Sequence, residues 1–146
     1  MTESPYPDFH HAYRLQVRWA DLDALGHVNN ATYLTYLEQA RIDFFNALAL
    51  WDGKPDKVGL IMARAVIDYK LPLNAEDDVT VHTRVARLGG KSFDTEQHVV
   101  CERDGQLAVA AVATITIVVY DYPANQSAAI PEEWRASLQS HGVGHA

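Results

Sequence analysis

The fold of this chain is decided by the stretch Asp21-Leu-Asp23-Ala-Leu-Gly26-His27-Val-Asn29-Asn30. Residues 13–19, just before it, alternate in polarity and predict a first β-strand. After it, apolar residues recur at three- and four-residue steps from about Tyr33 onward, which is the period of one helix face. Two carboxylates, a glycine, a histidine and two asparagines therefore gather where a strand ends and a helix begins.

The predicted helix extends from about Asn30 to Trp51. The asparagines at its start are good N-caps, and Gly53 followed by Pro55 is typical of a helix end. Its apolar face is formed by Tyr33, Leu37, Ala40, Phe44, Ala47, Leu48 and Trp51. Leu34 and Phe45 widen this face, so we expect the helix to be buried over most of its girth.

The rest of the chain is expected to be mostly β-structure. Strands are predicted at residues 58–73, 79–87, 92–103 and 106–120. A short helix is expected at residues 131–139, and residues 1–12 are expected to form a loosely held arm. The simplest packing is one α+β domain over residues 1–146, with a core at about 13–120 and a tail at 121–146, in which an antiparallel sheet curls around the helix.

The last predicted strand is apolar on both of its faces. One face carries Leu107, Val109, Ala111, Ala113, Ile115, Ile117 and Val119, and the other carries Ala108, Ala110, Val112 and Val118. A sheet that is apolar on both faces normally has both covered, and one helix covers only one of them. We therefore expect a homo-oligomer.

Composition excludes several classes of function. The 12 basic and 19 acidic residues give a net charge of −7, which argues against a general nucleic-acid or anionic-membrane surface. Cys101 is the single cysteine, so an intrachain disulfide framework is excluded. The first residues lack a signal-peptide pattern, and the apolar run at 107–120 is too short to span a bilayer as a helix. We expect a cytoplasmic soluble protein.

Asp23 is the candidate catalytic residue. A helix N-terminus presents unpaired backbone N–H groups and partial positive charge. An acid beside such donors can attack a carbonyl, or activate water toward it, while the donors stabilise the oxyanion that develops. The alternative is that Asp23 only caps the turn. Asp21 is assigned to holding the loop, and because the two acids lack accompanying His or Cys ligands, no metal site is expected.

The block from Val17 to Arg41 resembles the hotdog-fold acyl-CoA thioesterases of the 4-hydroxybenzoyl-CoA thioesterase type. The similarity continues through residues 67–73 and 89–93. It implies a five-stranded antiparallel sheet wrapped around one long central helix, with active sites at the interface of a homodimer or homotetramer. It also implies hydrolysis of an acyl thioester without metal or redox cofactor. The family's catalytic carboxylate corresponds to Asp23, and its backbone oxyanion donor to Asn30.

Other residues of the loop are candidates for binding the substrate. Gly26 provides an unusual backbone conformation or room for close approach, and His27 holds the loop or contacts substrate. Asn29 is a helix cap, a role compatible with catalysis because a well-formed helix end orients the oxyanion donors. Tyr33 is either a core aromatic residue or a substrate contact.

A second group of candidates is basic. Arg87, Lys91 and Ser92 lie around a Gly-Gly turn and could bind the phosphates or pantetheine of CoA, or could form an ordinary hairpin end. Arg64 lies in an apolar strand and needs a partner or a ligand.

The leading prediction is therefore a thioesterase acting on acyl-CoA or acyl carrier protein. The alternatives are a non-catalytic acyl-CoA sensor and an enoyl-thioester hydratase of the same fold. The sequence leaves the acyl group, the carrier, the nucleophile or general-base role of Asp23, and dimer against tetramer open.

Overall fold

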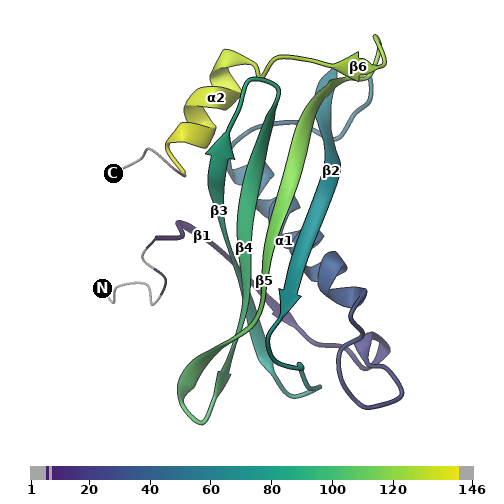
Figure 1. Cartoon of the computed structure of the whole chain (residues 1–146), viewed down its shortest axis with the longest axis vertical. Coiled ribbons are helices and arrows are strands. Elements are labelled where there is room, and N and C mark those ends of the chain that lie inside the picture. The colour runs from purple at the N-terminus through teal and green to yellow at the C-terminus, as the bar shows by residue number, and fades with distance from the viewer. Residues whose placement is uncertain (1–5, 7, 142–146) are drawn as a thin grey trace.

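The structure is a computed structural model that describes residue 6 and residues 8–141 (Figure 1). The expected loose arm lies partly outside these residues, at 1–5 and 7. The elements in chain order are β1 His11–Gln16, the 3₁₀ turn η1 Trp19–Asp21, α1 Thr32–Ala47, β2 Val58–Tyr69, β3 Asp78–Leu88, β4 Ser92–Arg103, β5 Gln106–Asp121, β6 Gln126–Ser127 and α2 Glu132–Gln139.

The strands form one antiparallel sheet in the order β1-β3-β4-β5-β2, with the short β6 paired to β5. β1 and β2 are therefore at opposite edges of the main sheet, and α1, which connects them, crosses one face of it (Figure 1). This confirms the predicted α+β architecture of an antiparallel sheet curved around a central helix.

The core lies between α1 and the sheet. Leu37 and Ala40 from α1 are fully buried, and Phe44 is nearly so. Opposite them, the alternating residues of β3 at 79, 81, 83 and 85 all point inward, as their period of two predicts.

Three predicted element ends are wrong. β1 ends at Gln16 rather than at Trp19, where the 3₁₀ turn η1 begins. α1 ends at Ala47 rather than near Trp51, because Ala49 adopts a left-handed conformation (φ 54°) that turns the chain away from the helix axis. β2 ends at Tyr69 rather than at residue 73, shortly before Pro72. Strand β4 and the start of β5 match the prediction.

The described part of the N-terminal arm is packed rather than loose. Phe9 is buried, and the Tyr6 ring stacks on His82 with centroids 4.3 Å apart. β1 begins at His11, two residues earlier than predicted. The sequence did not predict this packing because the arm covers strands more than 70 residues away in the chain.

A bulge in β5 changes which residues face the core. Val99 pairs with Ala111 but Val100 pairs with Val109, so Ala110 is an extra residue in β5. The bulge reverses the inward and outward alternation before it. Leu107, predicted to share the face of Ile115, is consequently 48% exposed, whereas Ile115 is fully buried.

The β2 edge and the adjoining side of α1 expose apolar side chains. The predicted burial of α1 over most of its girth is therefore wrong for the single chain, because one side faces outward beside β2. We call this set the edge patch: Leu34, Ile42, Ile61, Met62, Val66 and Tyr69, all at least 38% exposed. Contiguous apolar surface of this kind marks an interaction site.

Candidate active site

The loop between η1 and α1 folds back on itself as a small hairpin. Leu22 bridges Val28, and the Asp23 N–H donates to the His27 carbonyl at 2.7 Å. Gly26 turns the chain with φ +81°, a conformation that favours glycine and confirms its predicted backbone role. A further bridge joins His27 to Asn74, so the loop is anchored to the segment between β2 and β3.

Asp21 anchors the start of this loop through buried hydrogen bonds. It is 2% exposed, and its carboxylate accepts hydrogen bonds from the Tyr36 hydroxyl at 2.6 Å and from the backbone and guanidinium of Arg18 at 2.9 Å. Burial alone would raise the pKa of Asp21, but the hydrogen bonds from Arg18 and Tyr36 outweigh it and lower the pKa. The sequence predicted a structural role for Asp21 but identified neither partner.

Asp23 lies at the surface of the same loop. Its Oδ1 accepts the backbone N–H groups of Leu25 at 2.9 Å and of His27 at 3.3 Å. Its Oδ2 has no hydrogen-bond partner among the described residues. The carboxylate is thus oriented through one oxygen and leaves the other free, so capping the turn does not use its full hydrogen-bonding capacity.

The start of α1 follows directly. The Asn29 side chain accepts the Ala31 N–H at 2.8 Å, which orders the turn before the helix, although the residue at the N-cap position itself is Ala31. The Asn30 carbonyl accepts the Tyr69 hydroxyl at 2.8 Å. Within the described chain no acceptor takes the Asn30 N–H, so this donor remains available.

Tyr33 and Tyr69 pack together under this end of the helix. Tyr33 is buried, its hydroxyl reaches the Leu71 carbonyl at 3.4 Å, and its ring meets that of Tyr69 edge to face at 5.0 Å. Tyr69 is 46% exposed and is the contact that sequence reasoning missed, because residues 30 and 69 meet only once β2 lies beside α1.

The basic candidates lie elsewhere, on the sheet face opposite α1. Arg87 pairs with Asp94 at 3.0 Å and donates to the Ser92 hydroxyl at 2.9 Å. Arg64 is in register with Thr116, whose hydroxyl donates to Asp94 at 2.8 Å. Of the basic candidates, Arg64 and Lys91 have no ion-pair partner in the described part of the chain, although Arg64 interacts electrostatically with Asp94.

The two groups of predicted residues are far apart in one chain. Ser92 and Ile61 both pair with Val118, so the basic group is level with the start of β2. Asn30 is hydrogen-bonded to Tyr69, at the other end of β2. Eight residues of strand separate Ile61 from Tyr69, which corresponds to roughly 26 Å.

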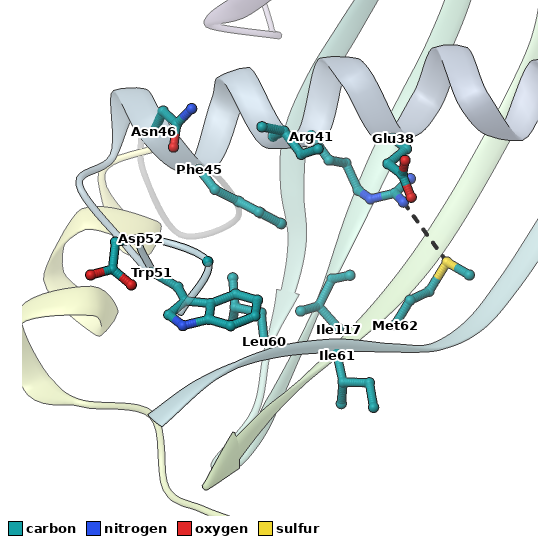
Figure 2. Close-up of a pocket in the computed structure, with 12 residues that line it drawn as sticks. Glu38, Arg41, Phe45, Asn46, Trp51, Asp52, Leu60, Ile61, Met62 and Ile117 are labelled. Carbon is teal, nitrogen blue, oxygen red and sulfur yellow. Dashed lines mark hydrogen bonds between the residues drawn. The ribbon is translucent and has the colours of Figure 1, made fainter. Parts of the chain in front are cut away.

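A cleft of about 430 Å³ lies between α1 and β2 and shares Ile42, Ile61 and Met62 with the edge patch (Figure 2). Its walls are mostly apolar: Ile42, Phe45, Trp51, Leu60, Ile61, Met62 and Ile117, with Glu38, Arg41, Asn46, Asp52 and Gly53 completing the lining. Arg41 is buried, and its guanidinium donates to the Gln97 side chain at 3.1 Å. Burial lowers the pKa of Arg41.

The remaining reactive side chains of the described residues form no second catalytic centre. Cys101 is buried and burial raises its thiol pKa, while His98 bonds to Tyr6 and Glu96 on the opposite sheet face. Over residue 6 and residues 8–141, no three His, Cys, Asp or Glu side chains are placed to share a metal ion. None of the described helices is long and apolar enough to cross a lipid bilayer.

Comparison with known proteins gives one consistent family. Residues 17–138 match the thioesterase-like superfamily. The chain is 31% identical to the long-chain acyl-CoA thioesterase FadM of Escherichia coli K12, over 86% of this chain and 95% of FadM. A Thermus thermophilus thioesterase solved with coenzyme A and zinc is 32% identical (TM-score 0.78), covering 91% of this chain and 94% of that one. The PA5185 protein of Pseudomonas aeruginosa is 26% identical (TM-score 0.82), covering 95% and 96%.

The match covers the Asp23 loop, the central helix and all the long strands, and the same fold recurs in these relatives. The chain belongs to the thioesterase-like superfamily and is a thioester hydrolase with the hotdog fold.

Proposed function

We propose that this enzyme hydrolyses acyl-CoA thioesters, with Asp23 as nucleophile or general base. The observation that carries the proposal is the pairing of an oriented carboxylate with an available backbone donor at one helix start. Asp23 Oδ2 and the Asn30 N–H are both without partners in the described chain, and the six residues of a closed hairpin and turn connect them. The N–H would stabilise the oxyanion formed as the thioester carbonyl is attacked.

The site requires a second protomer. In one chain Asp23 is exposed, and an exposed carboxylate lacks the water-excluded surroundings in which an oxyanion donor is most effective. Two β2 edges paired antiparallel would cover the edge patch of both chains. The same pairing would bring the Ile61 end of one β2 beside the Tyr69 end of the other.

This arrangement also joins the two distant groups of residues. Arg64, Lys91 and Ser92 of one protomer would lie near Asp23 of its partner, which removes the separation of roughly 26 Å. Arg64 and Lys91 would then bind CoA phosphates, while Arg87 holds the Ser92 hydroxyl in place. The overlap with a CoA-bound relative supports CoA as the carrier, and the net charge of −7 confines anion binding to such a local basic group.

Hydrolysis is favoured over the hydratase alternative by the position of His27. The Asp23 carboxylate accepts a hydrogen bond from the backbone N–H of His27, and the His27 imidazole makes no hydrogen bond to that carboxylate. A His-Asp pair for proton transfer at carbon is therefore not formed within the loop.

The test is a panel of acyl-CoA thioesters assayed by release of the free thiol. We expect turnover that Asp23→Asn abolishes, and saturable binding without turnover would identify the sensor alternative instead. Lys91→Ala should raise KM for acyl-CoA but not for the matching acyl-pantetheine, whereas the exposed Lys70→Ala is the control.

Mixed dimers test the shared site. Coexpression of Asp23→Asn chains with Arg64→Ala/Lys91→Ala chains should restore activity, because each mixed dimer would contain one intact site. Activity no higher than the sum of the two parent variants would contradict a site built from two protomers.

A further inference from the structure

The cleft between α1 and β2 has two chemically different ends. Figure 2 shows Glu38, Arg41 and Met62 at one end, nearer the start of the helix, and Asn46, Trp51 and Asp52 at the other. Between them the walls are the apolar side chains of Phe45, Leu60 and Ile117 together with neighbouring aliphatic residues.

A hydrocarbon chain has one orientation of lower free energy in such a cleft. Its terminal methyl placed against Glu38 would desolvate a carboxylate that has no hydrogen-bond partner in the described part of the chain, whereas Asp52 at the other end is already paired with Lys57 at 2.9 Å. The Glu38 end is also the end nearer the start of α1, where the proposed site holds the thioester, so the methyl end of the chain points toward Trp51.

The Trp51 indole is held in place by three separate contacts. Its Nε1 donates to the Lys54 carbonyl at 2.8 Å, and its ring stacks on Tyr122 at 5.3 Å with an interplanar angle of 14°. The third contact is with Gly59 of β2, which has no side chain. A Cβ at this position would lie only 2.7 Å from Nε1 of Trp51 and would clash with the ring. Gly59 is therefore glycine because the indole occupies the space of a side chain.

We propose that the seated Trp51 ring is the end wall of the acyl cleft and sets the longest acyl chain that the enzyme accepts. This inference rests on the proposed acyl-CoA hydrolysis and deepens it by assigning chain-length selection to a named residue. The occupant of the cleft is a straight or weakly branched acyl chain.

Two substitutions should move the wall in opposite directions. Trp51→Ala removes the ring and lengthens the cleft, so kcat/KM for hexadecanoyl-CoA relative to octanoyl-CoA should rise by about tenfold or more, the scale of a few methylenes gaining a pocket. Gly59→Ala pushes the ring away from β2 into the cleft, so the same ratio should fall by about tenfold. Should Trp51→Ala fail to fold, Trp51→Leu makes the same test.

Tyr122→Phe is the matched control. It keeps the stacked ring and loses only the hydroxyl contact to the Leu60 carbonyl, so the length ratio should not change. Binding of octyl- and hexadecyl-CoA thioethers, which are not hydrolysed, gives the same comparison without turnover. If the wild-type protein hydrolyses no thioester but the two variants still shift the relative affinity for the thioethers, the proposed function is refuted and the role of Trp51 as end wall is supported.

The inference is overturned if both variants keep the wild-type length ratio in hydrolysis and in thioether binding. It is also overturned if Trp51→Ala weakens binding and hydrolysis equally for all chain lengths and dissociates the oligomer. That result would identify the cleft as a subunit contact.

Discussion

Asp21 and Asp23 are two residues apart in one loop and have opposite surroundings. Asp21 is buried, and both of its carboxylate oxygens accept hydrogen bonds from Arg18 or Tyr36. Asp23 is exposed, and only one of its oxygens is engaged, by backbone N–H groups of its own turn. A carboxylate whose bonding capacity is filled can stabilise a fold but is poorly available to a substrate. Asp23 retains a free oxygen, as the role proposed for it requires.

The comparison shows how the loop is built. Asp21 ties the end of η1 to Arg18 on one side and to α1 through Tyr36 on the other. Its own carbonyl accepts the Asn29 N–H at 2.9 Å, which closes the hairpin that carries Asp23. The buried acid positions the backbone, and the backbone then orients the exposed acid.

Asp23→Asn should give the largest effect, and on activity alone. The amide oxygen can still accept the Leu25 and His27 N–H groups, so the free energy of unfolding should change by less than about 0.5 kcal/mol. Loss of the ionised oxygen should lower kcat by roughly a hundredfold or more. Thioester hydrolysis and urea unfolding of the purified variant measure the two quantities, and wild-type turnover would end the assignment of Asp23.

Asp21→Asn should show the reverse pattern. The amide NH₂ would face donors from Arg18 or Tyr36, leaving buried groups unsatisfied, so the free energy of unfolding should fall by about 2 kcal/mol. At a temperature where the variant remains folded, kcat/KM should fall less than roughly tenfold, since the reacting oxygen is intact. An activity loss equal to that of Asp23→Asn, without a loss of stability, would reverse the two roles.

Asp21 should contribute a measurable part of the pH dependence of stability. Because the folded pKa of Asp21 lies below its ordinary value, its contribution is complete above about pH 4 and is lost as the pH falls through the folded pKa. The difference in unfolding free energy between wild type and Asp21→Asn should therefore shrink as the pH is lowered. Urea unfolding at a series of pH values checks this, and a difference that is independent of pH would contradict it.

Most of the fold could be predicted from the sequence because it depends on local periodicity. Strand β4 begins and ends where its alternation and flanking turns indicate, and the period of three to four residues locates α1. The bulge at Ala110 could not be predicted, since alanines on both sides of β5 fit either face equally well. The early end of α1 depends on the single left-handed residue Ala49, which has no glycine or asparagine signal.

The site could be predicted only where its parts are adjacent in sequence. The loop from Asp21 to Asn30 supplies its own acid, turn glycine and helix start, so the motif locates them. The contacts that cross the chain were missed: Tyr36 to Asp21, Tyr69 to Asn30, and Gln97 to Arg41. They depend on how η1, β2 and β4 lie against α1. Gln97, a polar residue in an apolar strand, is a signal that could have indicated the third contact.

Tyr69→Phe should give the smallest effect and tests whether the helix start needs an outside support. The hydroxyl donates to the Asn30 carbonyl at 2.8 Å but lies at the surface, so its loss should change the unfolding free energy by about 0.5–1 kcal/mol. Without this bond the Asn30 carbonyl is less restrained, and the Asn30 N–H proposed as the oxyanion donor is then less well oriented. We therefore expect kcat to fall a few-fold while KM changes less.

The matched control for that variant is Tyr120→Phe. Its hydroxyl bonds to Asn125, beside the short β6 and away from the Asp23 loop, so it removes a comparable hydrogen bond without touching the site. A kcat of Tyr69→Phe that matches that of Tyr120→Phe would show that the hairpin closed by Asp21 orders the helix start unaided. A loss of kcat in Tyr69→Phe alone would show that β2 supports the start of α1 in addition to Asp21. The loop that carries Asp23 would then depend on contacts at both of its ends.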